Sequence, residues 1–177
     1  MAGRLEFIKS AEITTSVSTF DVTDCFSANY DVYKIVIDQL TTTGTASTDV
    51  AYRFIDNTSS VISSSNYDWA SLGLLAYNPF QENKATGETY IRKLGQADQE
   101  PEGVGIASYI FNPFSSSSYT FTLWQSSYSF GSGKGGTKGI GVLKQTNSIT
   151  GIQLYAVSQT RPFDEGTVRT YGLRVDS

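Results

Sequence analysis

The chain contains no histidine, and this absence removes more chemistry than any other feature of its composition. Ser-His-Asp and Cys-His catalysis, histidine metal sites and the commonest general base near neutral pH are all excluded. Cys25 is the single cysteine, so an intramolecular disulfide and a C-x-x-C metal or redox site are excluded as well. Because the surrounding run alternates in character, we expect Cys25 to be a small buried apolar residue and not a nucleophile.

Charged residues are scarce too, at 17% of the chain against roughly 25% in an ordinary globular domain. The net charge of −4 argues against nucleic acid as a partner, since phosphate binding needs clustered Lys and Arg. Lys134, Lys138 and Lys144 do gather in one region, which we interpret as a solvated loop. The opening MAGRLEFIKS lacks the apolar core of a signal peptide, and no later run approaches the roughly 18 apolar residues of a membrane span. These features predict synthesis in a cytoplasm and no membrane insertion.

Aromatic and small polar residues make up much of the composition where charged residues are scarce. Aromatics reach 13% of the chain, mainly as Tyr and Phe, and Ser, Thr, Asn and Gly supply the polar surface. Low charge combined with many aromatics is the reverse of the composition of a disordered chain. The 177 residues fit a single domain, residues 1–177, and a domain of that length buries about 70% of its unfolded surface.

Residues 106–130 carry the clearest structural pattern, two alternating runs on either side of a polar turn. Alternation with a period of two is typical of strands. Asn112-Pro113 ends the first run, because proline brings no N–H to a ladder, and a run of serines follows. We expect a central hairpin in which Phe121 is buried, so that Phe121→Ala would cost about 3–5 kcal/mol.

The rest of the chain also reads as short strands separated by turns. Residues 30–40 have apolar side chains on both alternating faces, which predicts a strand in the middle of a sheet. Residues 63–88 break the alternation, and we interpret them as a long aromatic excursion over one end, with a single helical turn at 70–76. The glycine-rich residues 131–141 are expected to form a mobile loop. Roughly eight to ten strands with little or no helix indicate an all-β fold, an antiparallel β-sandwich or barrel.

Carboxylates are the remaining catalytic candidates. Asp98, Glu100 and Glu102 cluster in the sequence, as do Asp164 and Glu165. A glycan-degrading enzyme needs two carboxyl groups roughly 5–10 Å apart, but both clusters lie in turn-rich stretches where solvated acids are expected. A calcium site suits such loops better than catalysis, yet no EF-hand spacing is present, and the glycine-rich loop lacks the residue order of a P-loop. We therefore assign no catalytic residue, no cofactor and no metal ligand, and expect no enzyme activity.

The aromatic loops allow a binding role. Aromatic anchors dominate protein interfaces energetically, and aromatic rings also stack on sugars. We expect most of these side chains to cap the core; the alternative is that they form a contact surface for a partner's groove or a glycan. The candidates for such a contact surface are Tyr67, Trp69, Tyr77, Phe80, Tyr128 and Phe130.

Four segments of the chain carry a resemblance to a known family. They are LEFIKS near the start, TDCFSANYDVYKIVID, SYIFNPFSSSSYTFTLWQSS and the closing DEGTVRTYGLR. In this order they resemble small all-β virion proteins of tailed bacteriophages, especially those of marine cyanobacterial phages, and the similarity covers nearly the whole chain. The closing pattern is moderately specific for a phage structural protein and does not distinguish one such protein from another.

The resemblance implies a jelly-roll β-sandwich without enzyme activity that is made in the host cytoplasm and assembles into the virion. Its implied partners are other virion proteins of the capsid or tail, and further copies of itself, such as a trimer. Because the first expected strand begins at Leu5 with no long arm before it, a capsid decoration (cement) or accessory protein is favoured. The alternative is a tail- or fibre-associated receptor-binding, lectin-like module that contacts a host-surface glycan.

Overall fold

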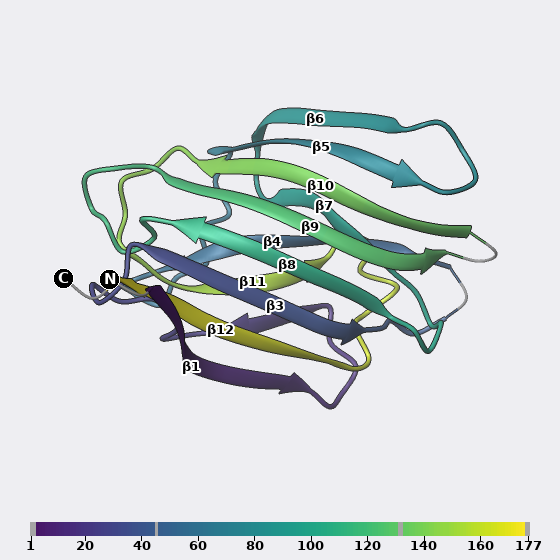
Figure 1. Ribbon diagram of the computed structural model, residues 1–177, viewed down its shortest axis with the longest axis horizontal. Helices are drawn as coiled ribbons and strands as arrows, with labels where there is room; N and C mark the ends of the chain where they lie inside the picture. Colours follow the sequence, from purple (N-terminus) through teal and green to yellow (C-terminus); the bar gives the residue numbers. More distant parts are fainter. Residues whose placement is uncertain (1–2, 45, 131–132, 176–177) are drawn as a thin grey trace.

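Two antiparallel β-sheets face one another as the layers of a β-sandwich (Figure 1). The computed structural model describes residues 3–44, 46–130 and 133–175. The larger sheet has eight strands in the order β1-β12-β3-β8-β9-β10-β5-β6, and the smaller has four in the order β2-β11-β4-β7. The strands are β1 Gly3–Ile13, β2 Thr19–Val22, β3 Val32–Leu40, β4 Thr48–Asp56, β5 Tyr67–Leu75, β6 Gln81–Glu88, β7 Ile91–Ala97, β8 Val104–Phe111, β9 Thr120–Phe130, β10 Gly133–Leu143, β11 Ile149–Ala156 and β12 Gly166–Val175.

The prediction of an antiparallel all-β sandwich is confirmed. All pairings between neighbouring strands are antiparallel, and no helix occurs in the part of the chain that the structure describes. That part forms twelve strands, more than the eight to ten expected, because two segments expected to be irregular are strands. A helical segment long and apolar enough to cross a membrane is likewise absent from the described ranges. The jelly-roll arrangement stays a prediction.

The expected central hairpin is present. Strands β8 and β9 pair in register from Val104 opposite Tyr128 to Phe111 opposite Phe121, and they lie in the middle of the larger sheet. The strand predicted over residues 30–40 is β3, which lies between β12 and β8 in the same sheet. Sequence alternation therefore located both elements.

The expected orientation of β9 is wrong. Phe121 is 52% exposed and points away from the smaller sheet, whereas Trp124 is fully buried between the sheets. The buried face of β9 also carries Thr120 and Thr122, and the Thr122 hydroxyl accepts a hydrogen bond from the Tyr52 phenol at 2.5 Å. One large indole and two threonines, of which Thr122 is hydrogen-bonded through its hydroxyl, therefore occupy the core side, and the large cost expected for Phe121→Ala does not apply.

Residues 63–88 are not an irregular excursion with a helical turn. They contain β5 and β6, which pair with each other and extend the larger sheet beyond β10 (Figure 1). On β5, Tyr67, Trp69 and Ser71 are buried on one face, and Ala70 and Leu72 lie on the other. Both faces carry apolar residues, which hides the alternation in the sequence.

Residues 131–141 do not form the expected mobile loop: from Gly133 onward they belong to β10, which pairs with β9 and with β5. The glycines are needed because larger groups lie over this strand. A Cβ on Gly139 would overlap the indole of Trp124, and one on Gly141 would come within 2.8 Å of Ile91 Cδ1. Residues 131 and 132 of the expected loop lie outside the described ranges.

Cys25 is buried at 1% exposure, as expected, and its thiol donates to the carbonyl of Val22 at 3.4 Å. Burial raises the pKa of the Cys25 thiol to about 12. Because the thiolate is the reactive form, we expect no modification of the folded protein by DTNB at about pH 8. Full reaction should appear once denaturant exposes the thiol. Rapid modification of the native protein, followed by absorbance, would show that the site opens or that the thiol is ionised.

Candidate functional site

The larger sheet presents an outer face, defined here as its side chains that point away from the smaller sheet. The strand register aligns one row of these side chains, as register partners, across six neighbouring strands. From β1 to β10 this row is Phe7, Tyr171, Lys34, Tyr109, Leu123 and Ile140. Phe7 and Ile140 are 60% and 62% exposed, so the two ends of the row are open to solvent.

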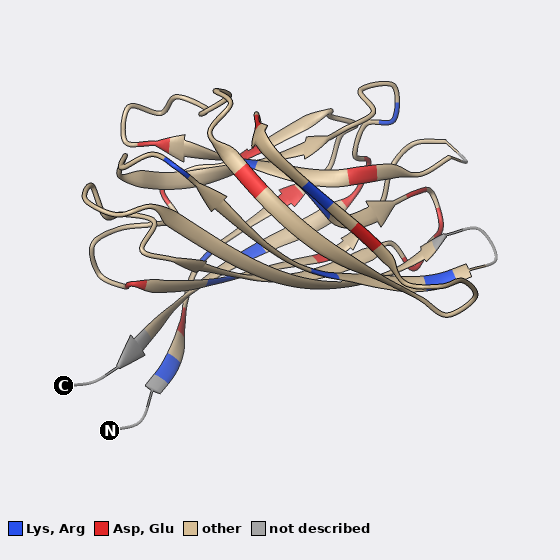
Figure 2. Ribbon diagram, turned by 90° about the horizontal axis from the view of Figure 1, so that it is seen from above, with Lys and Arg blue, Asp and Glu red and all other residues tan. Residues whose placement is uncertain are grey.

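Exposed apolar side chains are concentrated on this outer face. Those of large size are Leu5, Phe7, Leu74, Tyr109, Phe121, Leu123, Ile140 and Leu173. The outer surface of an antiparallel sheet in contact with water is ordinarily polar, and contiguous exposed apolar patches mark interaction sites. Strands β8 and β9 contain no charged residue along their described length. In Figure 2, Lys, Arg, Asp and Glu occupy only a small part of the ribbon.

A shallow groove of about 650 Å³ crosses the outer face above β5, β10 and β9. Leu72, Leu123 and Ile140 form its apolar floor, and Lys84 and Lys138 lie at its sides. Glu82 is the one acid among the residues that line the groove, so the lining holds no pair of carboxylates. The groove is suited to binding an apolar surface.

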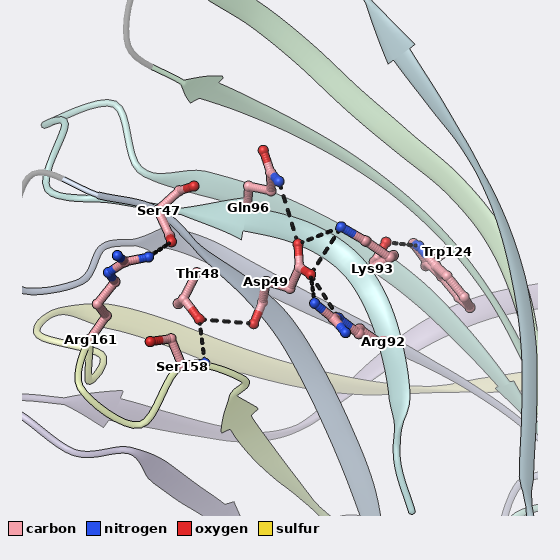
Figure 3. Close-up of polar contacts among 9 residues, drawn as sticks. All are labelled: Ser47, Thr48, Asp49, Arg92, Lys93, Gln96, Trp124, Ser158 and Arg161. Atoms are coloured by element: carbon pink, nitrogen blue, oxygen red, sulfur yellow. Dashed lines mark hydrogen bonds and ion pairs between the residues drawn. The ribbon is translucent and has the colours of Figure 1, made fainter. Parts of the chain in front are cut away.

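A second feature is a buried polar cluster where β4 meets β7 (Figure 3). The Asp49 side chain is 6% exposed, and its carboxylate lies 2.6 Å from Arg92 Nη2 and 3.0 Å from Lys93 Nζ. Gln96, the register partner of Asp49, adds a hydrogen bond at 3.4 Å. A buried carboxylate is stable only when paired and hydrogen-bonded, and three donors from β7 meet that need.

Lys93 connects this cluster to the core. Its backbone φ is +66°, a conformation that non-glycine residues rarely adopt, and it lies at an irregularity in the pairing of β4 with β7. Its carbonyl accepts a hydrogen bond from Trp124 Nε1 at 3.0 Å, while its ammonium group reaches Asp49 (Figure 3). Polar contacts of both the carbonyl and the ammonium group therefore hold Lys93 in this strained backbone conformation.

The third feature is a polar hollow between the inner face of β5 and β6 and the edge strand β7, here called the overhang hollow. Its volume is about 250 Å³. The side chains that line it include Ser71, Tyr77, Gln81, Asn83, Lys93, Gln96, Tyr128 and Thr137. Burial raises the pKa of the Tyr128 phenol, and the phenol of Tyr77 and the carboxylate of Asp49 raise it further. Tyr128 therefore stays neutral at physiological pH and can donate a hydrogen bond.

The structure divides the six aromatic candidates for a contact surface. Tyr67 is fully buried, and Trp69 and Tyr128 are 9% and 8% exposed, so these three pack in the core, as expected for most of the candidates, and the alternative of an exposed contact surface is wrong for them. The Tyr67 phenol donates to Ile62 O and accepts from Phe54 N, which explains its place in the core. The remaining candidates divide into Tyr77 and Phe80, which are exposed, and Phe130, whose side chain lies outside the described residues.

The two acidic clusters differ in burial, and neither forms a metal site in the described residues. Asp98 is buried, contrary to the expectation of a solvated acid, because its carboxylate accepts a hydrogen bond from the Glu100 N–H. Asp164 and Glu165 are exposed beside Glu12. Within the described ranges, no three Asp, Glu or Cys side chains are grouped so that they could hold a metal ion.

Two of the three lysines expected in a solvated loop belong to β10. Lys134 and Lys138 are exposed on that strand, and the Lys134 ammonium donates to Ser129 Oγ. Lys144 follows β10 and forms an ion pair with Asp68 at 2.8 Å. These positions place the lysines in or directly after a strand and not in a phosphate-binding loop.

Sequence reasoning missed Asp49, its cationic partners and the row of mostly apolar side chains on the outer face. Asp49 directly precedes the apolar run VAYRFI, and a carboxylate at the entrance to a buried strand is a weak signal for a buried ion pair. For the outer face, the signal is that both alternating sides of residues 106–111 carry large apolar or aromatic residues, and that one side of residues 119–124 consists of Tyr119, Phe121 and Leu123.

These observations define an antiparallel β-sandwich with an apolar outer face and a polar hollow at one edge. No family model matches the sequence, and no curated protein is significantly similar to it. Among solved structures, the crystal structure of infectious bursal disease virus VP2 subviral particle aligns with 98% of this chain at 8% identity and a TM-score of 0.16. The alignment spans 42% of that chain, and a likeness at this TM-score carries no argument.

Proposed function

We propose that the chain is a non-enzymatic structural component of a phage virion, a capsid decoration (cement) or accessory protein that stabilises the particle through protein–protein contacts. The observation that supports this role best is the outer face, where eight large apolar side chains are exposed on one sheet. The resemblance of the sequence to phage virion proteins supplies the biological setting.

The chemistry of the outer face favours a protein partner. Burying apolar surface yields about 25 cal/mol per Å², so a sheet face of this kind gains free energy when another protein surface covers it. Exposed aromatic and aliphatic side chains such as Phe7, Phe121 and Ile140 have the character of interface anchors. Lys34 lies within the exposed row, and Lys84 and Lys138 line the groove, so polar contacts would accompany the apolar ones.

Other virion proteins are the proposed partners, with further copies of the chain, such as a trimer, completing the assembly. A decoration protein binds a capsid lattice at a fixed ratio to the major subunit because lattice symmetry repeats the same site. This property separates the capsid role from a role in the tail, where far fewer copies would be bound.

Ile140→Glu is expected to weaken binding to phage particles that lack the protein by roughly tenfold or more, because it places a charge in the middle of an apolar interface. Ile140 is 62% exposed, so the thermal unfolding midpoint should change little. Labelled wild-type and variant proteins are compared by cosedimentation with the particles, and the bound ratio is read from the label.

Ser63→Glu is the matched control, since it adds the same charge at an exposed serine between β4 and β5, away from the outer face. It should bind as the wild type does. Equal binding by Ile140→Glu would show that the outer face is not the contact surface. Label confined to the tail in electron micrographs would rule out the capsid role and favour attachment.

A further inference from the structure

We infer that the overhang hollow is a binding site for a neutral sugar ring, free or at the end of a glycan. The inference does not depend on the virion role, because it uses a different surface. The hollow lies on the inner side of the larger sheet, and Ser71 and Asn83, which line it, also border the groove of the outer face.

The hollow exists because the two sheets differ in width. The smaller sheet ends at β7, which packs beneath β8, β9, β10 and β5, and β6 lies beyond it at the edge of the larger sheet (Figure 1). The smaller sheet therefore has no strand opposite β6, and the inner face of β6 and of the adjoining part of β5 borders the hollow. Gly73 on β5 and Gly95 on β7 line the hollow without a side chain.

One polar group in the hollow has no protein partner. The Ser71 side chain is 8% exposed, lines the hollow, and its hydroxyl makes no hydrogen bond to any described residue. A buried hydroxyl without a partner costs free energy of about 1–3 kcal/mol, and Ser71 differs from the other unpartnered hydroxyls of the described residues because it lines the hollow. A ligand hydroxyl placed in the hollow would complete its hydrogen bonding.

The remaining lining matches the two kinds of surface on a sugar. Tyr77 and Tyr128 supply aromatic rings for the apolar face of a pyranose. Gln81, Asn83 and Gln96 each carry an amide, which donates and accepts at neighbouring positions as vicinal hydroxyls require. A few placed polar groups with aromatic walls are the usual composition of a small-molecule site.

Charge and size restrict the ligand further. Lys93 is the one residue with a formal charge among those that line the hollow, and Asp49 compensates its ammonium group at 3.0 Å. The Lys93 ammonium group is therefore already engaged by a carboxylate, although Asp49 also pairs with Arg92, and this favours a neutral ligand over a phosphate or carboxylate. The volume of about 250 Å³ lies just below the roughly 300–1,000 Å³ of sites for drug-sized molecules, which suits one ring.

The test is ligand-observed saturation-transfer NMR on the full chain with glucose, galactose, mannose and xylose, each as the free sugar and as the non-reducing end of a short oligosaccharide. We expect saturable transfer to at least one sugar. Stronger binding of the oligosaccharide would identify a glycan end as the ligand, and equal binding a free sugar. Inorganic phosphate is added as a competitor and should have no effect.

Ser71→Ala is the informative variant, because removing an unpartnered hydroxyl should leave the thermal midpoint unchanged or higher while weakening binding roughly 3- to 10-fold. Tyr77→Ala, at an exposed ring, should weaken it by about tenfold. Ser108→Ala is the control: its hydroxyl is also buried without a partner in the described structure, and it does not line the hollow.

Ser108→Ala should bind as the wild type does. Absence of transfer to every sugar, unchanged binding in both Ser71→Ala and Tyr77→Ala, or displacement by phosphate would each overturn the inference. Because the particle-binding experiment uses Ile140 on the opposite face, either proposal can fail without the other.

Discussion

Trp124→Ala is expected to destabilise the protein by about 3–5 kcal/mol, as large aromatic truncations in a packed core do. Trp124 is the largest fully buried side chain, and it lies in β9 at the centre of the larger sheet. Its indole N–H donates to the carbonyl of Lys93 at 3.0 Å, so truncation also leaves that carbonyl of β7 without its partner. The free energy of unfolding is measured by urea denaturation, followed by far-ultraviolet circular dichroism.

The indole depends on a glycine in the neighbouring strand. Gly139 lies opposite Trp124 in the β9–β10 pairing, and a Cβ there would overlap the ring. Gly139→Ala should therefore cost about 1–3 kcal/mol through overpacking. In the Trp124→Ala background the ring is gone, and the same Gly139→Ala change should cost close to nothing. The coupling between the two sites is the quantity that the double-mutant cycle measures.

Gly105→Ala on β8 is the matched control, since a Cβ there meets only Ser127 Oγ at 3.7 Å, an ordinary contact distance. It should change the free energy of unfolding by less than about 0.5 kcal/mol. If the Gly139→Ala and Trp124→Ala effects simply add, the indole does not occupy the space above Gly139.

This pair also shows why β10 was mistaken for a loop. Glycine-rich stretches are typical of turns and linkers, and the sequence GKGGTKGIGVL contains little else to oppose that interpretation. The reason for the glycines lies in other segments, because Trp124 and Ile91 fill the space where their side chains would stand. The sequence of β10 alone does not show that an aromatic ring from another segment packs against its glycines.

The fold class was predictable because period-two alternation is a local property, and it located the β8–β9 hairpin and β3. The face of β9 was not predictable in the same way. Phe121 and its neighbours form the more hydrophobic side of the strand, yet they face solvent, while Trp124 with two threonines faces the core. Alternation distinguishes two faces, and only packing decides which of them is buried.

The polar parts of the candidate sites were beyond local reasoning for a related cause. Asp49 and Arg92 are 43 positions apart and meet only because β4 pairs with β7. Tyr77 and Tyr128 were both named from the sequence as aromatic candidates, but the overhang that brings them to one hollow follows from the unequal widths of the sheets. Ser71 has no distinguishing feature in the sequence at all.

Alkaline pH is expected to destabilise the fold steeply, because buried thiol and phenol groups cannot ionise in place, and the largest effects are expected at Cys25, Tyr52 and Tyr67. Burial raises the pKa of the Tyr52 and Tyr67 phenols above the usual value of about 10, and it raises the pKa of the Cys25 thiol to about 12. In the unfolded chain the thiol ionises near pH 8.5 and the phenols near pH 10. The unfolded state then binds fewer protons than the folded state, so the free energy of unfolding falls as pH rises.

The stability linked to these groups is fully present below their unfolded-state pKa values and is lost as pH rises toward their folded-state values. Each group contributes a slope of about 1.4 kcal/mol per pH unit. The free energy of unfolding should therefore fall at about 1.4 kcal/mol per unit between roughly pH 8.5 and 10, and at about 4 kcal/mol per unit above pH 10. Urea denaturation at closely spaced pH values measures both slopes.

Two variants assign the slopes to their groups. Cys25→Ala should flatten the dependence below about pH 10 and leave the two phenols to act above it. Tyr52→Phe should reduce the upper slope by about 1.4 kcal/mol per unit, although it costs about 1 kcal/mol at neutral pH because Thr122 loses its hydrogen-bond donor. An upper slope unchanged in Tyr52→Phe would mean that this phenol ionises within the folded protein, and hence that the centre of the sandwich admits water.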